Sequence, residues 1–367
     1  MLFCIALIIF LYTLQILKYR IGWDRIKPEN PQAFTPKVSI VIAMRNEEKE
    51  ITRLIAALKT QIYPTDSLEF ILVNDHSTDA TLDLLEKAKL DNLQIVNMPD
   101  GQFGKKNAIA KAVQIAKGEI ILSSDADCSF SSNWVRTMVS YFSNSNIMLV
   151  SGPVCFHKQK GIFHSLQALE FTSLIGSGAG AIGMGNAIFC NGANMAFRKS
   201  IFLEVNNFST DKVVSGDDVF LLHNVKEKYP KSIAFAKNED AIVTTDGAQS
   251  IKDFINQRKR WTAKSSGYKD GASIYTSLLV LFTNIVGVLL LGLVLFDTYY
   301  LDYFIYYFSV KFLADLCLLL PVLNFFQRKD LTKWILPFEL FYSFYIVLIV
   351  ILSFTNSFEW KGRVHKK

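Results

Sequence analysis

Short apolar runs and helical periodicities alternate in the first part of the chain. Between the runs, apolar residues recur at helical spacing, as in Ile51, Leu54, Ile55 and Leu58. Strands that are apolar almost throughout and alternate with amphipathic helices predict an α/β fold with a mostly parallel sheet covered on both faces. The predicted strands are VSIVIAM (38–44), EFILVND (69–75), LQIVN (93–97) and EIILSSD (119–125).

Much longer apolar segments occupy the last third of the chain. Residues 274–296 carry no charge, residues 303–326 carry one lysine and one aspartate, and residues 334–354 carry one glutamate. Each segment is long enough to cross a hydrocarbon core of roughly 30 Å as a helix. The pattern therefore predicts a small bundle of transmembrane helices.

A fourth apolar segment, residues 2–17, begins the printed sequence. No small-residue cleavage site follows it, so we expect a retained membrane anchor and not a signal peptide. The basic residues just after it place its C-terminal flank in the cytosol by the positive-inside rule. These residues are Lys18, Arg20, Arg25 and Lys27.

The two patterns divide the chain into four expected parts. They are an N-terminal membrane anchor (1–20), an α/β domain (36–270), transmembrane helices (274–356) and a basic C-terminal tail (357–367). If the α/β domain is cytosolic, three full crossings leave the basic tail outside, against the positive-inside rule. Either the last segment, with Pro337 and Glu339, is re-entrant or kinked, or the tail lies on the far side.

Composition supports a membrane protein. Half of the 367 residues are hydrophobic, which is high for a soluble chain of this length. The net charge, 39 − 33 = +6, is small, and much of it lies beside the apolar segments, which favours an anionic membrane leaflet over nucleic acid. Five scattered cysteines without a C-x-x-C pair indicate neither a zinc site nor disulfides, as expected in a reducing compartment.

Polar side chains follow the predicted strands where each strand ends. Arg45, Asn46 and Glu47 follow the first, Asp75 ends the second, and a D-x-D pair follows the fourth. Ligands of open α/β sheets bind beyond the carboxyl ends of the strands. The sequence therefore predicts a binding site at this edge of the sheet.

The D-x-D pair, Asp125 and Asp127, predicts a divalent metal site. Side chains two apart share a face if the strand continues, and like charges held close favour a cation between them. Mg²⁺ or Mn²⁺ takes carboxylate oxygens and commonly completes its shell with substrate phosphates. The alternative is a solvated turn in which Asp127 caps a helix beginning near Ser131.

Three further groups are open to a structural and a functional interpretation. Asp75 belongs to a segment that resembles a helix N-cap region but can also accept hydrogen bonds from a base or ribose, whereas Asp79 is assigned to capping. Lys105 starts a predicted helix and is either a phosphate contact or a solvated lysine. Asp217 and Asp218 start another predicted helix, where the dipole favours acidic residues, or supply a general base.

Two segments near the membrane part are equally ambiguous. QRKRW (257–261) is either a lipid-surface anchor or a clamp for a diphosphate leaving group. Residues 164–194 begin as an amphipathic helix and become rich in Gly, Ala and Ser, which favours either close helix packing or a segment at the membrane interface that admits a lipid head group.

Six motifs in order resemble the family 2 inverting glycosyltransferases with a GT-A fold, over residues 37–262. QRKRW is similar to the Q-x-x-R-W motif of membrane-bound members such as cellulose, hyaluronan and ceramide glucosyl synthases. EWKGR (359–363) is similar to a feature of bacterial membrane members. The motifs are VSIVIAMRNEE, FILVNDHSTD, GKKNA, SSDADC, SGDDVFLL and QRKRW.

The resemblance implies roles for individual residues. The donor would be a nucleotide-diphosphate sugar, in the first place a UDP-sugar, bound with divalent Mg or Mn held by the second D-x-D aspartate. Asp218 would be the catalytic base, although its neighbour Asp217 stands where the motif has glutamate. The implied nucleotide-sugar contacts are Asn46, Glu47, Asp75, Lys105 and Asp125, the metal ligands Asp127 and Asp125, and the diphosphate or acceptor contacts Asp217, Gln257, Arg258, Arg260 and Trp261.

The expected function is transfer of a hexose to a lipid or lipid-linked hydroxyl by a multi-pass protein of the inner cell membrane with its catalytic domain in the cytoplasm. Few membrane segments and no long insertion favour a lipid acceptor over a growing polymer. Synthesis of a surface polysaccharide is the alternative, and a non-catalytic membrane scaffold that keeps the fold is a third. The expected partners are the donor, the acceptor and membrane lipids, and no nucleic acid.

Overall fold

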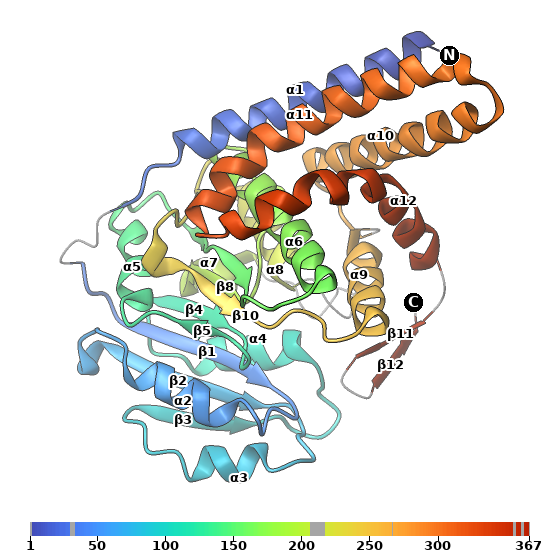
Figure 1. Cartoon of the computed structure of the whole chain (residues 1–367). Coiled ribbons are helices and arrows are strands. Elements are labelled where there is room, and N and C mark those ends of the chain that lie inside the picture. Colours follow the sequence, from blue (N-terminus) through green and yellow to red (C-terminus); the bar gives the residue numbers. More distant parts are fainter. Residues whose placement is uncertain are drawn as a thin grey trace. The chain divides into compact units, whose positions relative to one another are not determined.

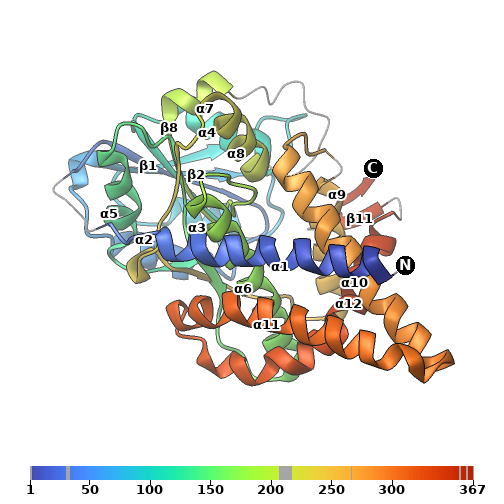
Figure 2. The same cartoon turned by 90° about the horizontal axis from the view of Figure 1, so that it is seen from above.

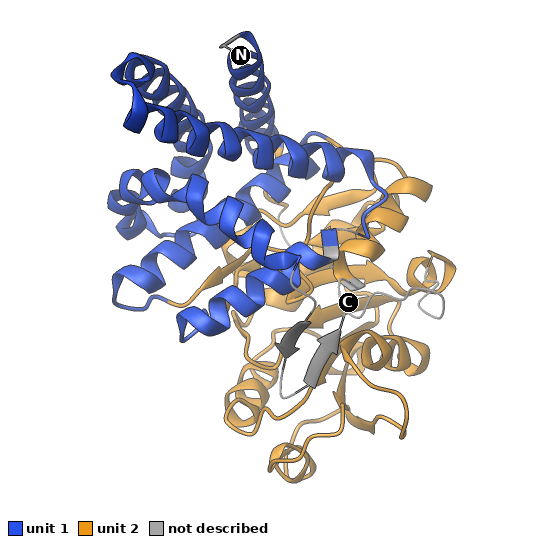
Figure 3. Cartoon of the chain, turned by 90° about the vertical axis from the view of Figure 1, so that its right-hand side faces the viewer, with its two compact units in different colours: residues 1–25, 158–184, 247–367 blue, residues 26–157, 185–246 orange. Residues whose placement is uncertain are grey.

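The computed structural model describes residues 2–29, 34–205, 217–265, 267–354, 357–360 and 363–366. The chain forms two compact units that interleave along the sequence (Figure 3). The sheet unit consists of residues 26–157 and 185–246, and the helix unit of residues 1–25, 158–184 and 247–367. Ser215 and Gly216 of the SGDDVFLL motif and Lys361 and Gly362 of EWKGR lie outside the described residues.

A seven-stranded sheet, with the order β3-β2-β1-β4-β8-β6-β9, forms the centre of the sheet unit in its described part (Figure 1). The first four strands in this order are parallel, β8 is antiparallel to both of its neighbours, and β9 is parallel to β6. The predicted mostly parallel α/β fold is confirmed. The strands are β1 (Val38–Met44), β2 (Leu68–Asn74), β3 (Leu93–Asn97), β4 (Ile120–Ser124), β6 (Leu149–Ser151), β8 (Asn194–Arg198) and β9 (Ile233–Phe235).

The central strands are apolar on both faces because helices cover them. Val41 and Ile42 of β1 are adjacent in sequence, point to opposite faces, and are both fully buried. α4 packs against β1 and β2. The helices of this unit are α2 (Ile51–Lys59), α3 (Thr81–Glu86), α4 (Lys105–Ile115), α5 (Trp134–Ser140), α7 (Lys199–Val205) and α8 (Asp217–Lys228), with the 3₁₀ segments η1 (Thr65–Ser67), η2 (Tyr141–Ser143) and η3 (Glu239–Ala241).

A smaller sheet of the order β5-β10-β7 adjoins the end of β4 in sequence. β10 is antiparallel to β5 and parallel to β7. Its strands are β5 (Ser129–Phe130), β7 (Val154–Phe156) and β10 (Val243–Thr245). Asn194 is fully buried in the same unit. It accepts a hydrogen bond from Nε1 of Trp134 and donates to the carbonyls of Pro153 and Ala241, which ties β8 to the segments just before β7 and β10.

Six helices make up the helix unit within the described residues. Four of them are long and apolar enough to cross a membrane, over Phe3–Arg25, Gly271–Phe296, Thr298–Phe325 and Lys329–Ser353. They match the four expected apolar segments. The helices are α1 (Leu2–Arg25), α6 (Ile162–Gly183), α9 (Ile251–Ser265), α10 (Gly271–Phe296), α11 (Leu301–Phe325) and α12 (Ile335–Ser353), with η4 (Thr298–Tyr300) and η5 (Lys329–Trp334); the remaining strands, β11 (Ser357–Trp360) and β12 (Arg363–Lys366), pair antiparallel.

The glycines of α1 and α6 let the two helices touch along their backbones. A Cβ atom on Gly22 would lie 1.9 Å from the carbonyl oxygen of Gly180, and one on Gly180 would lie 2.3 Å from that of Tyr19. α1 also packs against α11, beside which it lies in Figures 1 and 2. Of the two interpretations of residues 164–194, the structure supports close helix packing for the small residues of α6.

An ion cluster is buried between three of the long helices. Nζ of Lys311 lies 2.8 Å from Oδ2 of Asp315 and forms a second ion pair with Glu339, while the hydroxyl of Tyr12 donates to Oδ1 of Asp315 at 2.6 Å. Lys311 is 1% exposed. Each charge in the apolar segments thus has a partner of opposite sign, as charges at membrane depth require.

α12 is one continuous helix. Pro337 lies in its first turn, where a missing N–H leaves no hydrogen bond unmade. The structure therefore does not support a kink at Pro337 as an answer to the topology question. The proline inside a long helix is instead Pro321, in α11.

Candidate functional site

Polar side chains gather beyond the carboxyl ends of β1, β2 and β4 in the sheet unit. These strands are parallel neighbours, so the loops that follow them leave the sheet at the same edge. The loop after β1 is bonded to the loop after β2 by Asn46, whose Oδ1 accepts from N of Thr78 at 2.8 Å and whose N donates to the Ser77 hydroxyl at 3.0 Å. N of Glu47 donates to the Thr81 hydroxyl at 2.8 Å.

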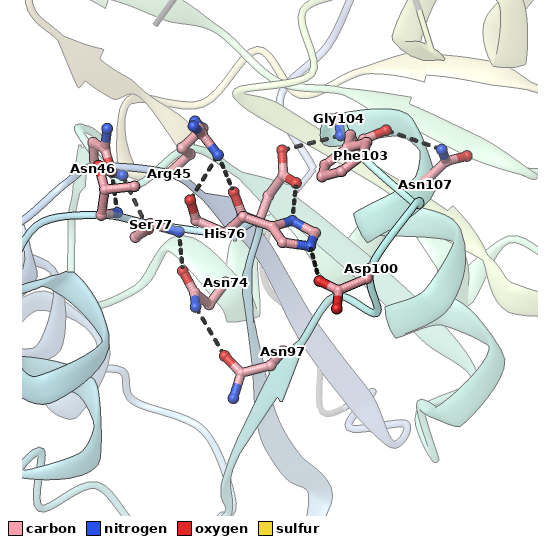
Figure 4. A network of polar contacts seen from close by, with 12 residues as sticks. Arg45, Asn46, Asn74, His76, Ser77, Asn97, Asp100, Phe103, Gly104 and Asn107 are labelled. Carbon is pink, nitrogen blue, oxygen red and sulfur yellow. Dashed lines mark hydrogen bonds and ion pairs between the residues drawn. The ribbon is translucent and has the colours of Figure 1, made fainter. Parts of the chain in front are cut away.

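A network of polar contacts lies at this edge (Figure 4), and Asp75 bonds to two of its labelled members, His76 and Gly104. It is 3% exposed, and its two carboxylate oxygens face different partners. Oδ1 lies 3.1 Å from Nδ1 of His76, and Oδ2 accepts a hydrogen bond from N of Gly104 at 3.0 Å. Asp75 therefore connects β2 to the start of α4.

Arg45 fixes the backbone around Asp75. Its Nη1 donates to the carbonyl of Asp75 at 2.9 Å and to that of His76 at 2.6 Å (Figure 4). His76 and Asn46 both have left-handed backbones, with φ of 56° and 54°. Such conformations are uncommon for residues other than glycine and cluster at functional sites.

An aromatic pair, which the sequence interpretation missed, lies beside Asp75. The rings of His76 and Phe103 are 4.6 Å apart at their centroids, and Phe103 is 49% exposed (Figure 4). His76 belongs to the FILVNDHSTD motif, and Phe103 directly precedes the GKKNA motif. The signal that could have found them is an aromatic residue next to each motif's polar residue, since a half-exposed ring offers a flat apolar face to a base.

Lys105, Asp125 and Asp218 are brought together around one glycine. Nζ of Lys105 lies 2.5 Å from Oδ1 of Asp125. A Cβ atom on Gly192 would lie 3.5 Å from Nζ of Lys105 and 3.3 Å from Cβ of Asp218. The three residues come from α4, the end of β4 and α8.

Asp218 is the second residue of α8 and is held by two backbone amides. Its Oδ2 accepts from N of Gly192 at 3.0 Å, and its Oδ1 accepts from N of Val219 at 2.9 Å. Hydrogen bonds to the charged form favour the ionised carboxylate, and so does the helix N-terminus. The loop that contains Gly192 is fixed in turn by the hydroxyls of Ser123 and Ser124 at the end of β4, which donate to the carbonyls of Gly192 and Ala193.

Asp127 points to a different partner from Asp125. β4 ends at Ser124 and a turn follows, so the strand alternation that would place both aspartates on one face does not apply. Oδ2 of Asp127 accepts from the Thr245 hydroxyl at 3.1 Å. α5 begins at Trp134 after Asn133, so the alternative that Asp127 caps this helix is wrong.

The donor set around Asp127 suits a hard cation. No group of three or more His, Cys, Asp or Glu that could hold a metal occurs in the described residues. Burial and the negative charges of Asp127 and Asp125 raise the pKa of the Cys128 thiol, which therefore remains neutral. One or two half-exposed carboxylates with substrate phosphates are the ligand set that Mg²⁺ or Mn²⁺ takes.

The Q-x-x-R-W residues lie on α9 of the helix unit. Gln257, Arg260 and Trp261 are half-buried, whereas Arg258 is 3% exposed. Arg258 forms an ion pair with Glu170 of α6. The partner glutamate was not singled out in the sequence, and the only signal for it was an acidic residue inside an otherwise uncharged helix.

The chain matches known proteins in the region of this site. Residues 39–205 match the profile described as "Glycosyl transferase family 2". The chain is 33% identical over 119 residues to "Beta-monoglucosyldiacylglycerol synthase" of Nostoc sp., a match over 32% of this chain and 25% of that protein. It is 26% identical over 196 residues to "Poly-beta-1,6-N-acetyl-D-glucosamine synthase" of Staphylococcus epidermidis, over 51% of this chain and 45% of that protein.

The chain spans less than half the length of the curated relatives it matches. Among solved structures, it is similar to "Mannosyltransferase PcManGT from Pyrobaculum calidifontis in complex with GDP-Man and Mn2+". That match has a TM-score of 0.60 at 16% identity and covers 97% of this chain and 99% of the other. Residues 39–205 thus match the profile of glycosyl transferase family 2, and the α/β unit that contains them has a GT-A-like fold.

Proposed function

We propose that this protein is a membrane-bound inverting glycosyltransferase that moves a hexose from a nucleotide-diphosphate sugar to the hydroxyl of a lipid or lipid-linked acceptor. We infer that the sheet unit faces the cytoplasm, where nucleotide sugars are made. The match to glycosyl transferase family 2 and the four long apolar helices support the class and the membrane association.

The observation that carries the proposal is the meeting of Lys105, Asp125 and Asp218 around Gly192. A lysine that can bind phosphate and a carboxylate that accepts hydrogen bonds from two backbone amides lie at the carboxyl edge of the parallel strands. Inverting transfer needs a group that takes the acceptor proton and groups that stabilise the charge on the departing diphosphate.

Donor binding is assigned to the first half of the site. Asp75, with the His76 and Phe103 rings beside it, would contact the base and ribose, and the loop of Asn46 and Glu47 would border the nucleotide. Asp127, oriented by Thr245, would hold a divalent metal, with Asp125 beside it. When bound, that ion supplies positive charge to the donor diphosphate.

The chemical step is assigned to Asp218. Its carboxylate would accept the proton of the acceptor hydroxyl as that oxygen forms a bond to the anomeric carbon. The bond from this carbon to the diphosphate breaks, and the nucleoside diphosphate leaves with the electron pair. A single displacement inverts the anomeric configuration. Lys105 would stabilise the charge that grows on the leaving group.

The acceptor is the second part of the proposal. A relative named as a glucosyldiacylglycerol synthase supports a lipid acceptor, while one named as a polysaccharide synthase supports the alternative of a growing polymer. We favour a lipid because four membrane helices leave little room for a polymer-conducting channel.

An extraction assay tests the proposal. Membranes containing the full chain, or its Asp218→Asn variant, are incubated with Mg²⁺ or Mn²⁺ and one radiolabelled donor at a time, including UDP-sugars and GDP-mannose. Label that enters the organic phase only with the wild-type chain supports a lipid acceptor. Insoluble label of high mass supports the polymer, and no label with any donor favours the non-catalytic scaffold and contradicts the proposal.

A further inference from the structure

Glu170 stands apart from the rest of α6. It is an ionisable residue in a helix otherwise made of apolar, small and neutral polar side chains apart from His164, and it is 4% exposed. A buried carboxylate is retained only where several donors satisfy it. Its surroundings within the helix unit therefore show what it is for.

Two side chains from two other helices converge on this carboxylate. Nε of Arg258 on α9 lies 2.9 Å from each carboxylate oxygen, and Nη2 forms an ion pair with Oε2. The hydroxyl of Tyr345 on α12 donates to Oε1 at 2.9 Å. Glu170 thus joins α6, α9 and α12 at one point.

Each nitrogen of the Arg258 guanidinium has a hydrogen-bond partner inside the unit. Nε and Nη2 face Glu170, and Nη1 donates to Oε1 of Gln257. Its Cζ atom lies 4.2 Å from the centroid of the Trp261 ring and 4.5 Å from that of Phe254. An arginine that is 3% exposed, with each nitrogen in a hydrogen bond and aromatic rings against its face, is poorly placed for a bidentate contact to a diphosphate.

We propose that Glu170 and Tyr345 are positioning residues for the Q-x-x-R-W helix, and that Arg258 is its internal anchor and not a substrate contact. We call the cluster of Glu170, Arg258 and Tyr345 the clamp. The clamp would set the rotation of α9 about its axis and hold the Trp261 ring against Arg258. Arg260 would then carry the diphosphate contact. The inference rests on the proposed glycosyl transfer, and it reassigns one of the residues that the resemblance implied.

The protonation of the pair is consistent with a permanent anchor. Burial alone would lower the pKa of Arg258, but the adjacent Glu170 carboxylate raises it above its ordinary value. The arginine is therefore charged at any pH at which the protein works, and the clamp does not open by titration of Arg258.

A double substitution separates an anchor from a substrate contact. The full chain is purified as wild type, Arg258→Met, Glu170→Met and the combination of both. Each single variant leaves a buried charge without a partner, and misplacing α9 by about 1 Å is expected to lower kcat on the order of 100-fold. The combined variant leaves no unpaired charge. Its kcat should therefore be at least about 10-fold higher than that of either single variant, and its donor KM should stay near the wild-type value.

Two results would contradict the proposed positioning role of Glu170 and Tyr345. The combined variant could remain as inactive as Arg258→Met, or Arg258→Met could act mainly by raising the donor KM, and either result would mean that Arg258 touches the donor. Wild-type protein that transfers no sugar would instead sink the proposed function, so the two failures are distinguishable.

A milder pair keeps the test decisive if the methionine variants do not fold. Tyr345→Phe removes one hydrogen bond to Glu170 and leaves the ring, and kcat should fall severalfold with KM unchanged. Tyr306→Phe removes the hydroxyl of a 63% exposed tyrosine on α11 and should change nothing. Equal rates for these two variants would contradict the positioning role.

Discussion

Nζ of Lys105 lies 2.5 Å from Oδ1 of Asp125, so the first residue of α4 reaches the first residue after β4. The two side chains are 25% and 35% exposed. A pair that water reaches in this way contributes at most about 1 kcal/mol to folding. The ion pair therefore adds little to stability, and we propose that the charge of Lys105 serves a ligand.

Replacement of Lys105 should weaken donor binding. We expect Lys105→Met to raise the donor KM about 10-fold, the equivalent of about 1.4 kcal/mol, since one charge-assisted contact to phosphate is lost. The thermal midpoint should hardly change. Initial rates against donor concentration measure the effect, and Lys111→Met, an exposed lysine on the same helix, is the control. A normal KM in Lys105→Met would remove this lysine from the site.

Thr245 should tune the metal dependence through Asp127. Its hydroxyl is 3.1 Å from Oδ2 of Asp127, and loss of a partner that orients a metal ligand typically costs about 10–100-fold in metal affinity. Thr245→Val should therefore move the Mn²⁺ midpoint of transfer upward without lowering the rate at saturating metal. Asp127→Ala should lose most transfer and much of the donor affinity at any metal concentration.

Thr244→Val is the matched control because Thr244 lies on the same strand and points to the other face. Its Mn²⁺ midpoint should equal that of wild type. If Thr245→Val also keeps the wild-type midpoint, Asp127 is not the metal ligand that we propose.

The Asp218→Asn variant should still bind the donor but should transfer the sugar very slowly. Loss of a general base typically costs about 10²–10⁴-fold, so kcat should fall by at least about 100-fold while the donor KM changes little. The Asp217→Asn variant distinguishes the two adjacent aspartates, because its kcat should fall much less than that of Asp218→Asn. Single-turnover rates with a saturating acceptor measure both. The reverse ranking would assign the base to Asp217.

Removal of the cation of the buried ion cluster should destabilise the helix unit. Lys311→Met leaves Asp315 and Glu339 without their partner, and breaking a buried pair typically costs about 3–5 kcal/mol. The thermal midpoint of the detergent-solubilised chain should drop by several degrees. Lys329→Met, an exposed lysine at the start of η5, should leave it unchanged. The thermal midpoint of the triple variant Lys311→Met/Asp315→Asn/Glu339→Gln should be higher than that of Lys311→Met, because the triple variant buries no unpaired charge.

The local pattern of apolar residues predicted the strands and helices whose length is sufficient to show such a pattern. The four parallel strands, the helices between them and the long apolar helices agree with the sequence patterns within a few residues, except that α1 runs on to Arg25. Strands as short as β6, β7, β9 and β10 carry no readable period, and the antiparallel insertion of β8 depends on tertiary pairing. The resemblance nominated the site residues, but contacts between distant segments determine their surroundings.

Two features of the site show why the contacts of its residues could not be predicted from the sequence. The D-x-D pair was expected to share a face because a continued strand was assumed, whereas the turn after Ser124 sends Asp127 to Thr245, 118 residues away. The ion pair of Arg258 with Glu170 joins residues 88 positions apart, and no local pattern marks a partner at that distance.

The contact between Gly22 and Gly180 makes α1 a specific part of the helix assembly. A generic hydrophobic tether can be exchanged for any apolar sequence of the right length, but here even a methyl group at position 22 would meet the backbone of α6. A foreign membrane anchor that lacks a glycine at this position would therefore push the two helices apart, whatever its hydrophobicity. Chimeras and N-terminal fusions of this protein should keep residues 19–22 unchanged and attach upstream of them.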